Sequence, residues 1–124
     1  MRHRTKARAA IERRVMPERQ AFIAETMSCA ACGSEWRKSF PAVLDVHEVI
    51  RGGARAKMIQ DRRAWLVVCR MHNQEMHNLT KWPVVVQFSL KLAQDPEWFD
   101  LPWLNSQRGA GVGFSLAEVV EATP

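Results

Sequence analysis

The sequence predicts a small α+β protein with two short strands in its middle and helices at both ends. Residues 43–49 alternate β-branched and polar side chains, and residues 65–69 form a short apolar run, so both segments have strand character. The other segments carry helix start and stop signals at serine, aspartate and proline residues. A length of 124 residues is typical of one domain.

The N-terminal region, residues 1–28, is predicted to be a basic helical arm. Residues 5–15 are rich in Ala and Arg, which favour helices. The residue before a proline is pushed out of the α region, so this helix is expected to end before Pro17. Pro17 then suits the first position of a second helix that runs to about residue 27.

The central region, residues 29–81, contains the two strands and most of the residues with chemical potential. Between the strands, residues 51–63 are expected to form a loop, which opens with two glycines and carries five Lys or Arg residues. Residues 70–81 contain neither Gly nor Pro, and they predict a helix that stops just before Pro83.

The C-terminal region, residues 82–124, is predicted to be a helical extension. Residues 83–93 are apolar and are expected to be helical despite three consecutive valines. Asp95 followed by a proline predicts the start of another helix, with an N-cap and a proline at the first position. A glycine-rich joint at residues 109–113 precedes a last short helix, which Ser115 begins in a capping box.

Positive charge is concentrated at the front of the chain. Residues 1–20 have a net charge of +5, residues 21–81 of +3, and residues 82–124 of −3. Because cations that neutralise phosphates release counterions, this pattern and a pI near 9.6 predict nucleic-acid binding. The alternative is a solvated helix face that binds nothing. No apolar stretch reaches the ~20 residues of a membrane span, and we expect a cytoplasmic protein with no membrane association.

Two pairs of potential metal ligands have the same spacing. Cys29 and Cys32 form the first pair, and Cys69 and His72 form the second. Two ligands separated by two residues can grip one face of a tetrahedral zinc ion, and a second pair closes the other face. The sequence therefore predicts a structural Zn²⁺ that staples a small core. Three cysteines in a cytosolic chain argue against disulfides, and the alternative is that they are ordinary small core residues.

A second cluster is expected inside the segment that the zinc would close. His47 and Glu48 lie on the first strand, and Asn73 and His77 are four residues apart on one face of the following helix. His47 and His77 are expected to hold a catalytic divalent cation (Mg²⁺, Mn²⁺, Ni²⁺ or Zn²⁺) against a phosphate, with Asn73 beside them. The alternative is that these histidines are ordinary surface or core residues.

These motifs, in this order and spacing, resemble those of zinc-knuckle HNH endonucleases of phages and bacteria. The resemblance covers about residues 29–78 and implies a zinc-stapled ββα-metal core that hydrolyses DNA phosphodiester bonds, in a bacterial or phage-infected cell. It places His47 and His77 at the family's metal-ligand positions. It places Asn73 directly after the last zinc ligand, where His or Asn is usual.

The chain departs from the family pattern at two positions. Glu48 stands where the family usually has its general-base histidine, and the middle asparagine of the motif falls near Ala64. A carboxylate can accept a proton from metal-bound water, although a reference pKa of ~4.3 makes it a weaker base than imidazole. Adjacent strand residues point to opposite faces, so Glu48 reaches the metal only if the strand bends there.

The leading functional prediction is therefore a metal-dependent DNA endonuclease in which the second cluster is catalytic. Five cations of the loop between the strands are expected to hold the DNA backbone: Arg51, Arg55, Lys57, Arg62 and Arg63. The first alternative is a non-catalytic zinc-binding module that binds DNA on the same fold. The second is a protein-interaction adaptor that uses Trp82, Trp98 and Trp103.

Overall fold

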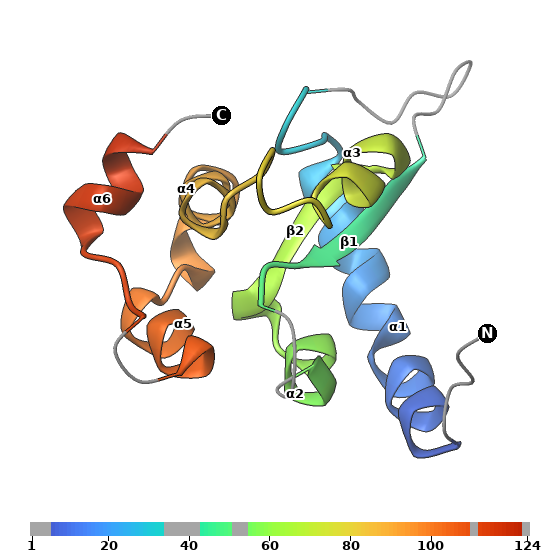
Figure 1. The fold of residues 1–124 in the computed structure, drawn as a ribbon. Helices are drawn as coiled ribbons and strands as arrows, with labels where there is room; N and C mark the ends of the chain where they lie inside the picture. The colour runs from blue at the N-terminus through green and yellow to red at the C-terminus, as the bar shows by residue number, and fades with distance from the viewer. Residues whose placement is uncertain (1–5, 34–42, 51–54, 110–111, 123–124) are drawn as a thin grey trace.

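The protein has an α+β architecture in which a two-stranded sheet lies between helices (Figure 1). β1 (Leu44–Glu48) and β2 (Trp65–Cys69) pair antiparallel, with Val46 opposite Val67 at the centre. Both strands agree with the predicted segments. The computed structural model describes residues 6–33, 43–50, 55–109 and 112–122.

Helices account for most of the described chain. α1 covers the sheet on one side and α4 to α6 lie on the other (Figure 1), while α3 follows β2 directly. No helix among the described residues combines the length and apolar character of a membrane span. The bounds are α1 (Lys6–Thr26), α2 (Arg55–Gln60), η1 (Arg62–Ala64), α3 (Arg70–Glu75), α4 (Val84–Gln94), η2 (Pro96–Trp98), α5 (Leu101–Arg108) and α6 (Leu116–Glu121).

The N-terminal region forms one helix rather than the two that were predicted. α1 continues through Pro17, although an interior proline removes one helical hydrogen bond and costs about 3 kcal/mol. Tertiary contacts on both sides of the proline offset this cost. Val15 and Phe22 are buried, and Arg19 donates hydrogen bonds to the backbone carbonyls of Val46 and Ile59.

The predicted loop at residues 51–63 is also wrong in its second half. This part forms α2 and η1, and the side chains of Met58 and Ile59 are buried. Burial of these two apolar side chains outweighs the loop signal of the preceding glycines. Asp61 begins η1 because its carboxylate accepts a hydrogen bond from the backbone N–H of Arg63.

The helix after β2 is shorter than predicted. α3 ends at Glu75 because the side-chain oxygen of Asn78 accepts hydrogen bonds from the backbone N–H groups of Thr80 and Lys81. Such a turn competes with continued helix. His77 therefore lies beyond the end of α3 and does not share a helical face with Asn73.

The C-terminal region follows the prediction in most elements. α4 and the Ser115 capping box of α6 are confirmed. The helix expected after Asp95 is only the short η2, because the Asp95 carboxylate is held by Arg62 and Lys91 instead of capping. The next full helix, α5, begins after Asp100, whose carboxylate accepts a hydrogen bond from the N–H of Trp103. The predicted joint at residues 109–113 lies partly outside the described residues.

One hydrophobic core joins all three regions of the chain. It contains Phe22 of α1, the whole of β2, and Leu104 and Val119 of the C-terminal helices. The outward edges of both strands are also satisfied by side chains. Val67 donates from its N–H to Oε1 of Gln94 (2.8 Å) and accepts from Nε2 of Gln94 (2.9 Å). On the other strand, the carbonyl of Val46 accepts from Arg19 at 3.0 Å.

Candidate metal centre and histidine pair

The first half of the metal centre is a tight turn that follows α1. Gly33 adopts a positive φ of 71° and donates its N–H to the carbonyl of Cys29 at 2.9 Å, which closes the turn. The N–H of Ala31 points to the sulfur of Cys29 at 3.4 Å. Ala30 donates to the carbonyl of Val67, so β2 holds the turn in place.

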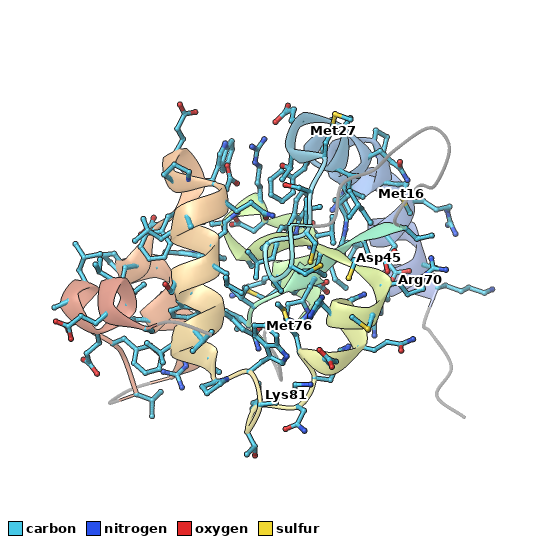
Figure 2. All side chains as sticks on the ribbon, turned by 90° about the horizontal axis from the view of Figure 1, so that it is seen from above. Met16, Met27, Asp45, Arg70, Met76 and Lys81 are labelled. Carbon is cyan, nitrogen blue, oxygen red and sulfur yellow. The ribbon has the colours of Figure 1, made fainter. Side chains whose placement is uncertain are left out.

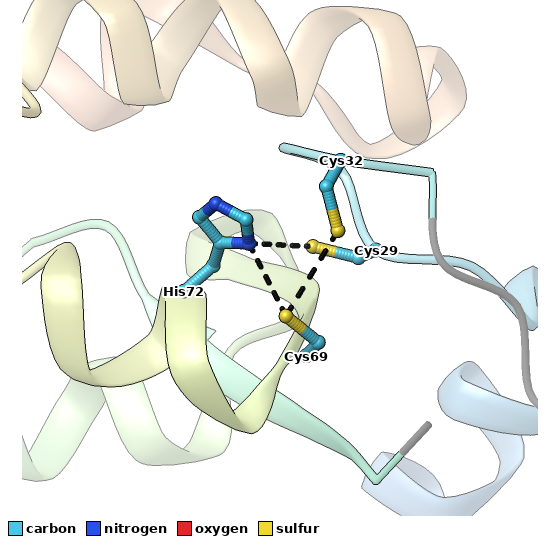
Figure 3. A group of neighbouring side chains, drawn as sticks. All are labelled: Cys29, Cys32, Cys69 and His72. Carbon is cyan, nitrogen blue, oxygen red and sulfur yellow. Dashed lines mark hydrogen bonds between the residues drawn. The ribbon is translucent and has the colours of Figure 1, made fainter. Parts of the chain in front are cut away.

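The second half lies where β2 meets α3, and it completes a four-residue cluster (Figure 3). Cys69 ends the strand and His72 lies in the first turn of the helix. Nδ1 of His72 is 3.2 Å from Sγ of Cys69 and 3.8 Å from Sγ of Cys29, and Sγ of Cys32 is 4.0 Å from Sγ of Cys69. All four ligand atoms lie within 4.8 Å of one another, as the shared spacing of the two pairs predicts.

These separations fit a tetrahedral metal ion. With metal–sulfur bonds of about 2.3 Å and metal–nitrogen bonds of about 2.0 Å, tetrahedral ligand atoms are about 3.5–3.8 Å apart. The cluster needs only small adjustments to reach these values. It is the one group of three or more His, Cys, Asp or Glu side chains in the described part of the chain that could hold a metal.

The Cys69 thiol shows what a bound cation would change. Burial raises the pKa of the Cys69 thiol, and the neighbouring sulfurs of Cys29 and Cys32 raise this pKa further. Crowded thiolates are therefore unfavourable on their own. A dication placed among them reverses the balance, because it stabilises the deprotonated sulfurs.

A second layer of side chains surrounds His72. Its Nε2 lies 3.5 Å from a carboxylate oxygen of Glu75, and the other oxygen of Glu75 accepts a hydrogen bond from the Lys81 ammonium at 2.7 Å. The ring of Trp82 packs edge-on against the imidazole, with centroids 5.6 Å apart. Nδ1 thus faces the sulfurs while Nε2 faces a carboxylate, an arrangement that orients metal-bound histidines in many proteins.

The structure divides the second predicted cluster into two pairs. The rings of His47 and His77 are neighbours, with centroids 5.8 Å apart in a T-shaped arrangement. His47 is 3% exposed, whereas His77 is exposed. Convergence of these two rings agrees with the expectation from the sequence.

A buried glutamine fixes the orientation of His47. The amide nitrogen of Gln87 donates to the carbonyls of Met76 and Trp82, so its Oε1 must accept the 2.7 Å hydrogen bond from Nε2 of His47. Nε2 of His47 therefore carries a proton, and this atom is not available as a metal ligand. Sequence reasoning missed Gln87, although a single amide within the apolar run of α4 was a usable signal.

Glu48 and Asn73 lie on the other side of β1. Glu48 forms an ion pair with Arg19 of α1 at 3.1 Å, and both Glu48 and Asn73 line a groove of about 650 Å³ beneath α1. β1 keeps its alternation and does not bulge here, so Glu48 points away from His47. The convergence that a catalytic carboxylate requires is not seen.

Two of the five cations expected to hold DNA are engaged elsewhere. Arg62 makes two hydrogen bonds to Asp95, and Arg63 pairs with Asp61 and Asp100. These carboxylates compete with phosphate for the two guanidinium groups. Of the remaining predicted residues, Lys57 is exposed, and Arg51 and the side chain of Arg55 lie outside the described part of the structure.

Other exposed cations lie on α1. Lys6 and Arg13 are exposed and form no ion pair with any described residue, and Arg14 donates to the side chain of Gln60 on α2. Arg70, by contrast, pairs with Asp45 across the start of α3 (Figure 2).

The three tryptophans of the adaptor hypothesis differ in exposure: Trp82 is buried, Trp103 is half-buried and Trp98 is 44% exposed. No family model, curated protein or solved structure matches the chain. Function is therefore inferred from the residues and their geometry.

Proposed function

We propose that this chain is a zinc-stapled DNA-binding protein built on an HNH-like ββα core. Three sulfurs and one imidazole nitrogen are the donors of structural zinc sites, and the four ligands leave no position open for a substrate. The zinc would join the end of α1 to the strand–helix junction after β2. Its role is to hold the fold, because a chain of 124 residues buries only a modest core.

The observation that carries DNA binding is the set of exposed cations on α1 and α2. Lys6, Arg13 and Lys57 have no carboxylate partner among the described residues, whereas the arginines of η1 are neutralised. Unpaired surface cations attract phosphates and release counterions from DNA. The zinc would fix the C-terminal end of α1, the helix that carries two of these cations.

Binding to a 20-base-pair duplex at several salt concentrations tests this proposal. Because each phosphate contact contributes about 0.9 to the slope of log affinity against log salt, the slope should fall by about one for each contact removed. Lys57→Ala and Arg13→Ala should each show this loss. Arg62→Ala should leave the slope unchanged in the fraction that remains folded. Affinity that does not respond to salt, or equal slopes in all variants, would contradict DNA binding through these cations.

A second candidate function, metal-dependent DNA hydrolysis, is favoured by the contact between the His47 and His77 rings. His77 would take part as a metal ligand, and movement of Gln87 would be needed to release Nε2 of His47. Glu48 would need to leave Arg19 before it could activate water. In the structure His47 is held by Gln87 and Glu48 by Arg19, and DNA binding is therefore the leading proposal.

Incubation with supercoiled plasmid separates the two candidates. Mg²⁺, Mn²⁺, Ni²⁺ or Zn²⁺ is added with and without chelator, and His77→Ala and Glu48→Gln are compared with wild type. A general base contributes about 10²- to 10⁴-fold. Chelator-sensitive nicking that His77→Ala abolishes would establish the endonuclease. Intact plasmid in every metal, together with retained duplex binding, would establish the non-catalytic module.

A further inference from the structure

A groove lies between α1, the end of α2 and the two short 3₁₀ helices. Its volume is about 610 Å³, within the range of small-ligand sites. Glu18 of α1, Gln60 of α2, Arg62 of η1 and Trp98 of η2 contribute to its lining. Neither the zinc cluster nor the histidine pair takes part in it.

Trp98 gives this groove an exposed aromatic surface. The Arg62 guanidinium lies between the rings of Phe22 and Trp98, 4.6 Å and 5.0 Å from their centroids. Asp95 fixes the same guanidinium through two hydrogen bonds. The indole is therefore supported on one side by a rigid cation, yet it remains 44% exposed. A supported and exposed indole is a platform for stacking.

The groove continues into the basic surface of α1 and α2. Arg14 lies one helical turn before Glu18 and donates to the side chain of Gln60 at the edge of the groove. Lys57 lies three residues before Gln60 on the same side of α2 and is exposed. Cations thus lie beside the groove, whereas Glu18, exposed and without an ion pair to any described residue, lies within its wall.

We propose that this groove binds an unpaired nucleobase on Trp98 while the phosphates of the same strand lie along Arg14 and Lys57. The inference rests on the proposed DNA binding and names the form of nucleic acid that the surface selects. Single-strand sites combine a cationic track with aromatic stacking platforms, and both occur here. The carboxylate of Glu18 disfavours a phosphate inside the groove, but it can accept a hydrogen bond from a base amino group.

Three ligands of equal length test the proposal: a 12-nucleotide single strand with mixed bases, its abasic analogue, and the 12-base-pair duplex. The abasic strand has the same phosphates but offers nothing to stack. We expect wild type to bind the base-bearing strand more tightly than the abasic strand. Trp98→Ala should weaken binding of the base-bearing strand by about 5- to 150-fold, the range that one stacked base supplies, and should not change binding of the abasic strand.

Trp98→Phe serves as the matched variant, because it retains a ring against Arg62 and should restore most of the affinity. Thermal unfolding of both variants checks that the fold is retained. Equal wild-type affinity for base-bearing and abasic strands, with duplex binding retained, would overturn this inference but not the proposed DNA binding. The exposed ring of Trp98 would then be a contact for a protein partner instead. Loss of binding to all three ligands would overturn the proposed function as well.

Discussion

The metal cluster and the histidine pair each include one strand residue, Cys69 of β2 and His47 of β1, but they are built in opposite ways. In the metal cluster, all four ligand atoms face a common centre, and Glu75 and Trp82 support His72 from behind. In the histidine pair, one ring is buried and held by Gln87, and the other is exposed beyond the end of α3. The first arrangement directs four ligand atoms toward one another, whereas the second is organised around packing.

The difference follows from how each set of residues is supported. A turn closed by Gly33 and a strand–helix junction hold ligands two residues apart, so local geometry is enough to aim them. The other set depends on the alternation of β1 and on the length of α3. For Glu48 to join His47, β1 would have to bulge, but Glu48 points to the other face and pairs with Arg19. For His77 to share a helical face with Asn73, α3 would have to continue past Glu75, where it ends. The comparison teaches that local order is enough to aim each ligand pair, while the fold must bring the two pairs together, and that catalysis would need a rearrangement.

Breaking the metal cluster should have the largest effect. Cys69→Ser removes one ligand and leaves a buried, weakly coordinating hydroxyl. We expect the protein to lose its metal and to unfold, since metal binding in small zinc sites supplies about 10 kcal/mol or more of folding free energy. Zinc content by mass spectrometry and thermal unfolding measure this. His77→Ala is the matched control from the other site and should retain one zinc per chain. A Cys69→Ser protein with wild-type zinc content and stability would contradict the assignment.

The histidine pair is tested through its buried glutamine. Gln87→Leu keeps the approximate volume but leaves Nε2–H of His47 and two backbone carbonyls without partners. We expect a loss of about 3 kcal/mol or more in the free energy of unfolding, because each of the three unsatisfied buried groups costs about 1–3 kcal/mol. Urea denaturation gives the value. Gln20→Leu, the same change at an exposed position of α1, should cost less than about 0.5 kcal/mol. Equal losses in the two variants would mean that Gln87 is not a structural anchor.

The buried ion pair of Lys91 and Asp95 is a third polar site, and it contains neither histidine nor cysteine. Burial lowers the pKa of Lys91 to about 8, although its contact with Asp95 at 2.7 Å opposes this shift. The unfolded chain therefore holds this proton more tightly than the folded chain. From this group, stability should rise by about 1–3 kcal/mol as the pH increases from about 7.5 to 10.5.

Lys91→Met should remove that rise while Arg62 continues to neutralise Asp95. Denaturant unfolding across this pH range, compared with exposed Lys57→Met, isolates the contribution. If the wild-type and Lys91→Met proteins show parallel pH profiles, Lys91 titrates at its ordinary value.

The support behind His72 should have the smallest effect. Glu75→Ala removes the carboxylate that faces Nε2 of His72, and we expect zinc affinity to fall by about 10-fold with little change in fold. Competition with a chromophoric chelator measures the affinity, and Glu75→Gln should restore part of it. Glu121→Ala, an exposed carboxylate on α6, is the control. An unchanged affinity in Glu75→Ala would show that His72 is oriented by packing against Trp82 alone.

Much of the fold and the metal cluster could be predicted from the sequence because they depend on short-range patterns. The strands follow alternation and apolar runs, and the cysteine spacing fixes the turn geometry. What could not be predicted depends on contacts between distant segments. Pro17 remains inside a helix because β1 and the core hold α1 on both sides, and no local rule contains that information.

The hydrogen-bond partners of Arg62, Lys91 and Gln87 could not be predicted from the sequence for the same reason. Arg62 has the sequence context of a DNA-binding loop, yet it forms an ion pair with Asp95, thirty-three residues later. Lys91 and Gln87 both lie in an apolar helix, where a polar residue is expected on the exposed face. Their burial follows from groups on other elements, the carbonyl of Arg62 and the ring of His47, that satisfy them.

The side chains on the outer edges of the sheet have a consequence for self-association. Val46 and Val67 face each other at the centre of the sheet; Arg19 donates to the outward carbonyl of Val46, and Gln94 pairs with both the N–H and the carbonyl of Val67. An unpaired strand edge is a template on which another chain can add a strand, and a two-stranded sheet has two such edges. Here the guanidinium and the amide occupy the middle of each edge, where a third strand would begin to pair. The β2 edge is also covered by the turn after α1, because the N–H of Ala30 donates to the carbonyl of Val67. Substitution of Arg19 would therefore expose the β1 edge, and we expect aggregation on storage, rather than loss of binding, as its first visible sign.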